Sequence, residues 1–296
     1  MQFLAFIIIY PFLWLISILP FRLLYIFSDG VYLLVYYVIG YRKKVVKDNL
    51  RLVFPEKSEQ EIKVISKKFY HHLCDMMLES VKSLTISEAS MKKRFRFTNI
   101  EEIHKFENQK KSVILIGGHY GNFEWIFIIQ RYITIRFYGV YKKLANKYFD
   151  RLVQRKRSRY NSRLITTKET VPELIKAKRN GELTVNGFAS DQSPHADKAH
   201  HWNDFMGVKV PIHVGAEVLA KKLDMAVVYF GIRKVKRGFY EMSFKTIAEN
   251  PKAFENYDIT DAYIKLLEQQ IHEAPEYYLW THKRWKHKGK VPEKFQ

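Results

Sequence analysis

The chain has 296 residues, which is enough for one large domain with a full hydrophobic core. Fifty Lys and Arg against thirty Asp and Glu give a formal net charge of +20, and 47% of the residues are hydrophobic, which excludes a disordered basic protein. The single cysteine excludes a disulfide framework and a multi-cysteine metal site, and it is compatible with a reducing compartment. The basic balance predicts a polyanionic partner: nucleic acid, an anionic membrane surface, a phosphorylated lipid or an acidic carrier protein.

The chain begins with an apolar segment. Residues Phe3–Phe21 contain no charge and, at about 1.5 Å per residue, nearly span a hydrocarbon core of about 30 Å. Pro11 predicts a kink and Pro20 the end of this helix, so a slanted or half-inserted anchor is the alternative to a full span. We expect no cleaved signal peptide, because no Lys or Arg precedes the apolar run and no alanine occurs between Ala5 and Ala89.

A second apolar stretch follows the turn-like sequence Ser28-Asp29-Gly30. Residues Val31–Ile39 are too short to cross a membrane as a straight helix, and their tyrosines suit a membrane interface. The basic run Tyr41–Lys47 comes next, and the positive-inside rule places it in the cytoplasm. We therefore predict an N-terminal membrane anchor and interfacial segment over residues 1–40 and a cytoplasmic catalytic domain over residues 41–296. The alternative is an apolar hairpin over residues 3–39 that packs into the protein's own core.

In the body, β-rich patterns alternate with helical ones. Ser58 is the expected N-cap of a long helix over residues 59–84, in which apolar residues recur every three or four positions. Further along, strands are expected over residues 112–116, 135–141, 183–188, 226–232 and 239–244, and helices over 122–133, 146–159 and 212–223. This alternation predicts an α/β fold whose central sheet, mostly parallel or mixed, is flanked by helices.

The string from Val113 to Trp125, VILIGGHYGNFEW, predicts a buried strand that leads through glycines into a helix. With Asn122 as N-cap, His119 lies on the preceding loop and Glu124 in the first helical turn. Glu124 can then accept a hydrogen bond from one imidazole nitrogen and leave the other free as a general base. The same spacing also arises by chance, as a core histidine beside a surface glutamate.

The motif contains no Ser or Cys that could serve as a nucleophile. We therefore expect the base to activate a hydroxyl of the substrate itself. Direct acyl transfer from a thioester fits this arrangement, because backbone N–H groups of the Gly-Gly turn can stabilise the oxyanion and no metal is needed.

These residues resemble a known family. The string Gly117–Glu124 is similar to the His-x₄-Asp/Glu box of lysophospholipid and glycerolipid acyltransferases, and specifically of the late acyltransferases of lipid A biosynthesis. The likeness covers nearly the whole chain. It includes Tyr41-Arg42, Asn49-Leu50, Phe54-Pro55, Arg157-x-Arg159-x-Asn161, Asp191-Gln192, Phe205-Met206-Gly207, Gly215 and Pro275–Trp285. Tyr277 departs from the pattern, which leads us to expect glutamine there.

The resemblance implies an O-acyltransferase of the lauroyl or myristoyl type. Such an enzyme moves a fatty acyl chain from acyl carrier protein, or from acyl-CoA, to a hydroxyl of a lipid A precursor at the inner membrane, with its catalytic domain facing the cytoplasm. No cofactor or metal is expected beyond the thioester co-substrate, and no nucleic acid is expected as a partner. The resemblance makes His119 and Glu124 catalytic. It makes the following residues substrate-binding: Gly118, Asn122, Arg157, Arg159, Asp191 and Arg284.

Alternatives remain at several positions. Asp191 can equally be an N-cap or turn residue, and any one basic residue of 283–290 can be a solvated or lipid-facing group rather than an anion contact. The loop with His195, His200 and His201 matches no compact metal motif, and we expect a polar loop there. The rival functions are acyl transfer to a glycerol-based or amino-acid-linked lipid, a non-catalytic adaptor that binds anionic lipid, and nucleic-acid binding, against which the apolar N-terminus argues.

Overall fold

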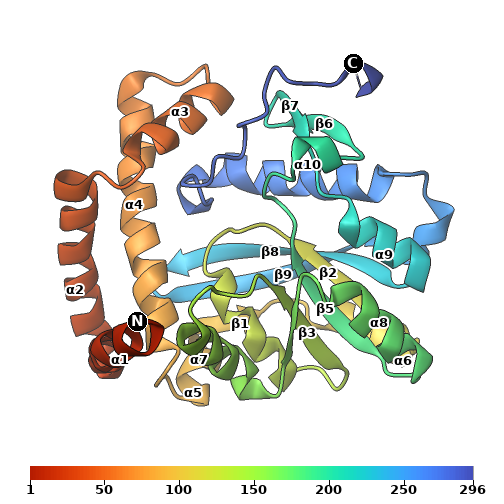
Figure 1. The fold of residues 1–296 in the computed structure, drawn as a ribbon, viewed down its shortest axis with the longest axis horizontal. Helices are drawn as coiled ribbons and strands as arrows, with labels where there is room; N and C mark the ends of the chain where they lie inside the picture. The colour runs from red at the N-terminus through yellow and green to blue at the C-terminus, as the bar shows by residue number, and fades with distance from the viewer. Residues whose placement is uncertain (296) are drawn as a thin grey trace.

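A seven-stranded sheet forms the centre of the body in the computed structural model, which describes residues 1–295 (Figure 1). Its strand order is β1-β9-β8-β2-β5-β3-β4. Strands β2, β3, β4, β5 and β8 are parallel to one another, whereas β9 runs antiparallel to β8. The strands are β1 Phe95–Phe97, β2 Val113–Gly117, β3 Arg136–Tyr141, β4 Arg163–Thr166, β5 Thr184–Ala189, β8 Ala226–Lys236 and β9 Phe239–Ala248, with β6 Trp202–Phe205 and β7 Val208–Pro211 forming a separate antiparallel pair. The predicted α/β fold with a mixed sheet is confirmed.

Helices surround this sheet and extend beyond one end of it. In Figure 1, α10 lies above the sheet and α5 and α7 lie below it, while α4 stands at one end with α1 and α2 outside it. The α-helices are α1 Gln2–Ile18, α2 Phe21–Leu33, α3 Lys43–Val53, α4 Glu59–Lys82, α5 Glu88–Arg94, α6 Glu101–Asn108, α7 Lys147–Arg157, α8 Thr170–Arg179, α9 Gly215–Leu223 and α10 Asp258–Glu273. The π-helical segment is η1 Leu34–Ile39, and the 3-10 segments are η2 Phe123–Arg131, η3 Ser158–Tyr160, η4 Ala196–Lys198, η5 Pro251–Ala253, η6 Pro275–Tyr277 and η7 Glu293–Phe295.

Strand β2 lies in the middle of the sheet, between β8 and β5, and all five of its residues are buried. A parallel strand covered on both faces needs a continuous apolar run, and residues 113–116 supply it. In open α/β sheets, ligands bind beyond the carboxyl ends of such strands. The loop that follows β2 is therefore in the position where a functional site is expected.

The long helix α4 begins as the sequence predicts. Ser58 Oγ accepts a hydrogen bond from the Glu61 N–H at 3.3 Å, and the Glu61 carboxylate accepts one from the Ser58 N–H at 2.8 Å. This reciprocal capping box satisfies two backbone donors that the helix itself cannot satisfy. The buried face of α4 carries polar side chains as well as apolar ones, among them Asp75 and Glu79, which are fully buried.

The break between the first two helices lies where it is predicted, because α1 ends at Ile18 and α2 begins directly after Pro20. The turn expected at Ser28–Gly30 is wrong, because these residues lie inside α2, which continues through η1. Within residues 1–295, one helical stretch, Phe21–Ile39, is long and apolar enough to cross a membrane, by length and composition only.

Tertiary contacts explain why the polar residues stay helical in α2. Ser28 Oγ donates a hydrogen bond to Asp75 Oδ1 at 2.8 Å, and Asp29 Oδ1 lies 2.6 Å from Arg237 Nη2. One face of α2 is therefore attached to α4 and to the turn between β8 and β9. The outward faces of α1, α2 and η1 are apolar and exposed, with Phe12, Ile26 and Val38 more than half exposed.

Candidate active site

His119 and Asp191 form the central pair of the site. Gly117 at the end of β2 is in register with Ala189 at the end of β5. His119 comes two residues after Gly117, and Asp191 comes two residues after Ala189. The parallel strands therefore deliver both groups to the same edge of the sheet. His119 Nδ1 lies 2.6 Å from Asp191 Oδ1, and no hydrogen bond from Nε2 is found among residues 1–295. The imidazole is thus held at Nδ1, Nε2 has no hydrogen-bond partner among the described residues, and the side chain is 19% exposed.

His119 and Asp191 shift each other's pKa in opposite directions. Burial alone would lower the pKa of His119, but the Asp191 carboxylate outweighs it and the pKa is raised. Burial alone would raise the pKa of Asp191, which is 2% exposed, but the imidazole and its hydrogen bond lower it. Asp191 therefore stays ionised and stabilises the protonated form of His119. This is the relation between base and orienting carboxylate that general-base catalysis requires.

Glu124 does not fill the role predicted for it. It makes no hydrogen bond to His119; its Oε2 lies 3.1 Å from Lys156 Nζ and 3.2 Å from Arg157 Nε, and its Oε1 pairs with Arg157 Nη2. Burial alone would raise the pKa of Glu124, but these two cations lower it to about 2. The predicted pairing is wrong because Lys156 and Arg157 of α7 bind the carboxylate and Asp191 occupies Nδ1 of His119; residues 123–131 also form a 3-10 helix and not the predicted α-helix. Glu124 still acts on His119 at a distance, since its charge contributes to the raised pKa of the imidazole.

The loop between β2 and η2 leaves no space for side chains at its glycines. A Cβ on Gly118 would lie 2.7 Å from Leu267 Cδ1, and one on Gly121 would lie 2.8 Å from Ile232 Cγ2. Gly121 also has a φ of +57°, a conformation that L residues rarely adopt. The loop backbone is therefore fixed by packing and not only by hydrogen bonds.

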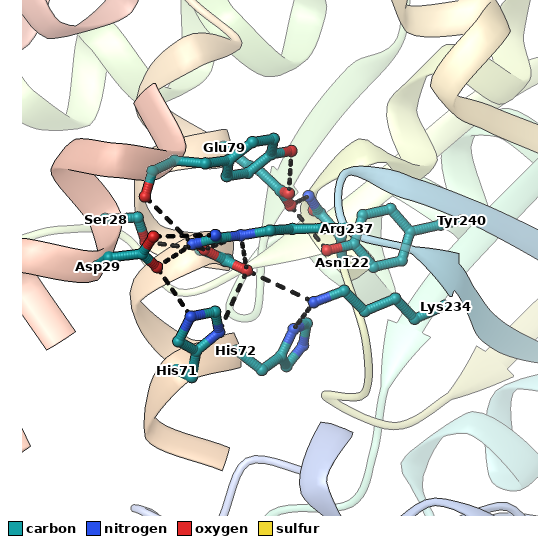
Figure 2. Close-up of polar contacts among 11 residues, drawn as sticks. Ser28, Asp29, His71, His72, Glu79, Asn122, Lys234, Arg237 and Tyr240 are labelled. Atoms are coloured by element: carbon teal, nitrogen blue, oxygen red, sulfur yellow. Dashed lines mark hydrogen bonds and ion pairs between the residues drawn. The ribbon is translucent and has the colours of Figure 1, made fainter. Parts of the chain in front are cut away.

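Asn122 ends this loop, but its side chain does not cap the following helix as predicted. Its Nδ2 donates a hydrogen bond to Glu79 Oε2 at 2.7 Å, inside the protein (Figure 2). Glu79 also accepts hydrogen bonds from Tyr25 Oη at 2.8 Å and Tyr240 Oη at 2.9 Å, and burial raises its pKa to about 7. One buried carboxyl group thus joins α2, α4, β9 and the loop that carries His119.

Among residues 1–295, neither of the other two predicted binding residues, Arg159 and Arg284, makes a hydrogen bond to the imidazole. Arg159 Nη1 donates a hydrogen bond to the carbonyl of Ile86 at 2.6 Å. Arg284 is 1% exposed, and its three guanidinium nitrogens have no hydrogen-bond partner among the described residues. Its guanidinium lies 5.0 Å from the ring centroid of Phe205, and burial lowers its pKa although the charge of Asp191 opposes this. Arg284 is therefore a buried cation beside the His119–Asp191 pair and does not belong to the exposed basic surface.

Segments from the two ends of the chain meet behind the site. Asn49 Nδ2 donates hydrogen bonds to the carbonyls of Trp280 and His282, both at 2.9 Å, and Arg42 Nη1 donates one to the carbonyl of Thr281 at 2.9 Å. The backbone N–H of Leu279 donates to the carbonyl of His119 at 3.2 Å. The C-terminal segment therefore directly supports the loop that carries His119.

Comparison with known proteins decides the family. A family model described as bacterial lipid A biosynthesis acyltransferase matches residues 2–287. The chain belongs to the bacterial lipid A biosynthesis acyltransferase family. Members of this family are acyltransferases, and the extent of the match agrees with a likeness that runs from the apolar N-terminus to the C-terminal motif.

Three relatives of this acyltransferase illustrate the similarity. It is 26% identical over 283 residues to the lipid A biosynthesis lauroyltransferase of Escherichia coli K12, covering 93% of this chain and 89% of the relative. It is 24% identical over 277 residues to the palmitoleoyltransferase of the same organism, covering 93% and 88%. It is 25% identical over 250 residues to a lipid A biosynthesis acyltransferase of Haemophilus influenzae, covering 83% and 78%.

Two residues that contact the candidate site were not predicted from the sequence. Lys156, in the last turn of α7, binds Glu124 and also donates to Ser80 Oγ at 2.7 Å, but in the sequence it is one member of a longer basic run. In the sequence, Glu79 is one of several polar residues in the long helix predicted over residues 59–84, and it does not stand out from the others. The only signal was its place on the apolar face of that helix, since a buried carboxylate needs partners. In the histidine-containing loop, His201 Nε2 lies 2.7 Å from Asp261 Oδ1, and no group of three metal-ligating side chains is found among the described residues.

Proposed function

We propose that this acyltransferase moves a fatty acyl chain from a thioester of acyl carrier protein, or from acyl-CoA, to a hydroxyl of a lipid A precursor. The observation that carries the proposal is the His119–Asp191 pair, with a distance of 2.6 Å at Nδ1 and an available Nε2, in a chain of this family. The thioester is a co-substrate, and the reaction uses no further cofactor and no metal.

In the proposed reaction, His119 Nε2 takes the proton of the acceptor hydroxyl while the hydroxyl oxygen attacks the thioester carbonyl. The new C–O bond gives a tetrahedral oxyanion, for which the N–H of Gly118 is the candidate donor. The C–S bond then breaks, and the leaving thiolate receives the proton from the imidazolium. Asp191 stabilises the imidazolium throughout, as its effect on the pKa of His119 supports.

In the same proposal, Glu124 is a positioning residue. Its ion pairs with Lys156 and Arg157 fix two basic side chains beside the catalytic loop. Its negative charge adds to that of Asp191 in favouring the protonated imidazole. Arg157, Arg159 and Arg284 contribute positive charge around the site, which suits an acidic carrier protein and a phosphorylated acceptor.

We further propose that residues 1–40 hold the enzyme at the inner membrane and that residues 41–296 form the catalytic domain on its cytoplasmic side. The exposed apolar surface of α1, α2 and η1 supports membrane insertion. Because Asp29 is bound to Arg237, α2 lies along the body and offers only its outer face to lipid. The basic residues just after Gly40 support the cytoplasmic orientation.

The test is acyl transfer by the purified full-length protein to a phosphorylated lipid A precursor, with acyl carrier protein thioester and acyl-CoA compared as donors. We expect transfer by the natural protein and a loss of about 10²–10⁴-fold in His119→Ala, which should remain folded and membrane-bound. Mass spectrometry of lipid A from cells with and without the gene gives the same test in the cell. Acylation of a glycerol-based or amino-acid-linked lipid instead, or an intact lipid A profile in His119→Ala cells, would refute the proposal.

A further inference from the structure

A cavity of about 460 Å³ lies between α2, α4, β8 and η6, separate from the His119–Asp191 pair. It is lined by five basic side chains: Lys67, Lys68, His71, His72 and Lys234. Tyr32 and Tyr277 complete the wall, and Glu276 is the single acidic residue that lines it. The volume is in the range of small-molecule sites, which is about 300–1,000 Å³.

The lysines of this cavity differ in exposure, and His72 adds no positive charge because burial lowers its pKa well below the usual value. Lys234 is 9% exposed, and its Nζ lies 3.3 Å from His72 Nδ1 and 5.4 Å from the ring centroid of Tyr277. Figure 2 shows Lys234 and His72 directed toward each other. At the mouth, the Lys68 side chain is 61% exposed, and its Nζ lies 3.8 Å from Glu276 Oε1. The ammonium group therefore remains accessible to solvent.

Two aspartates lie behind the wall, but they do not line the cavity. Arg237 binds both of them, with Nε 3.0 Å from Asp75 Oδ2 and Nη2 2.6 Å from Asp29 Oδ1. Asp75 also accepts a hydrogen bond from Ser28, and it is fully buried. Lys234 Nζ also lies 3.5 Å from Asp75 Oδ2, and His71 Nε2 lies 2.8 Å from Asp29 Oδ1, so these two cavity-lining groups are paired with the aspartates. The positive charge that faces the open space is therefore that of Lys67 and Lys68.

The mouth of the cavity adjoins the apolar N-terminal surface. Lys67 Nζ lies 6.0 Å from the ring centroid of Tyr37 in η1, and the neighbouring Val38 and Ile39 are 75% and 61% exposed. A ligand with an anionic head and apolar chains matches this combination. We propose that the cavity binds the phosphate group of a membrane lipid, whose acyl chains lie against η1.

Tyr277, which lines the cavity, also contacts the loop that carries His119. The ring of Tyr277 packs against His72 at 4.8 Å between centroids, and its carbonyl accepts a hydrogen bond from the Gly121 N–H at 3.0 Å. The lipid phosphate belongs either to a phospholipid or to the phosphorylated acceptor. The second assignment rests on the proposed function.

The test measures binding of dihexanoyl phosphatidic acid to the full-length protein in neutral detergent by calorimetry, with dihexanoyl phosphatidylcholine and inorganic phosphate as comparisons. The variant is Lys67→Gln combined with Lys68→Gln, at two positions on the surface of α4. The matched control is Lys63→Gln combined with Lys93→Gln, which removes the same charge from exposed lysines that do not line the cavity.

We expect phosphatidic acid to bind more tightly than the other two ligands, and the cavity variant to weaken this binding about tenfold or more while the control weakens it much less. An equal effect of both variants, or no preference for phosphatidic acid over phosphatidylcholine, would overturn the proposal. Inorganic phosphate binding as tightly as phosphatidic acid would make free phosphate the ligand and overturn the lipid assignment.

An activity measurement then separates the two sources of the phosphate. If the cavity variant raises KM for the phosphorylated acceptor and not for the dephosphorylated one, the acceptor supplies the phosphate. If KM is unchanged while binding of phosphatidic acid is weakened, a phospholipid supplies it. If the natural protein transfers no acyl chain at all, the proposed function fails, whereas the binding result stands.

Discussion

Replacing Glu124 by glutamine separates a structural role from a chemical one. The pKa of Glu124 falls from 4.5 to about 2 because Lys156 and Arg157 bind its ionised form against the opposing effect of burial. At about 1.4 kcal/mol for each tenfold change in an equilibrium constant, this difference corresponds to about 3 kcal/mol of stability at neutral pH. For a domain of this size, the loss should lower the unfolding midpoint by about 6–12 °C.

The measurement is thermal unfolding of the full-length protein in neutral detergent, followed by circular dichroism. The pKa of Glu124 is lowered in the folded state, so its contribution is present above about pH 4.5 and is lost as the pH falls toward 2. The difference between Glu124→Gln and the natural protein should therefore shrink in acid. The control is Glu59→Gln, which removes an exposed partner of Arg51 and should cost at most about 1 kcal/mol. An unchanged midpoint with lost activity would refute the reasoning and make Glu124 a participant in the chemistry at His119.

Three further changes test the other parts of the site. Asp191→Asn should lower kcat/KM by about 10²–10⁴-fold and shift the acidic limb of the pH–rate profile to lower pH, because the carboxylate no longer raises the pKa of His119; an unmoved limb would contradict the pairing. The pKa of Glu79 is raised by burial from 4.5 to about 7, so its contribution of about 3 kcal/mol is present below pH 4.5 and is lost as the pH rises through 7. Unfolding by urea should show this loss in the natural protein and not in Glu79→Gln, and equal profiles would exclude it. Arg237→Gln removes the cation that binds both Asp29 of α2 and Asp75 of α4, and it should destabilise the fold by about 3 kcal/mol. Limited proteolysis should then release α1 and α2 faster, and unchanged resistance would contradict the assigned attachment.

Local patterns in the sequence were enough to predict the frame of the fold. The apolar run 113–116 predicts the central strand because a strand buried on both faces allows no polar residue. Ser58 with Glu61 marks the start of α4 because both side chains satisfy backbone donors within one helical turn. The position of His119 beyond the strand follows from the two glycines before it.

The partners of the site residues were not predictable in the same way. His119 meets Asp191 only because β2 and β5 are neighbours, and the two residues are 72 positions apart in the chain. The sequence Ser28-Asp29-Gly30 has turn composition, yet Arg237 and Asp75, which are distant in sequence, hold it in a helix. In both cases a tertiary contact overrides a local preference.

The hydrogen bonds from Asn49 to the carbonyls of Trp280 and His282 have a consequence for biosynthesis. The ribosome releases residue 49 long before residue 282, so the N-terminal helices form while the rest of the chain is still being made. The hydrogen bond from Leu279 to the carbonyl of His119 forms only when the final segment of the chain has left the ribosome. If residues 1–40 are the anchor that we propose, a chain that terminates prematurely near the C-terminus should reach the membrane and be inactive.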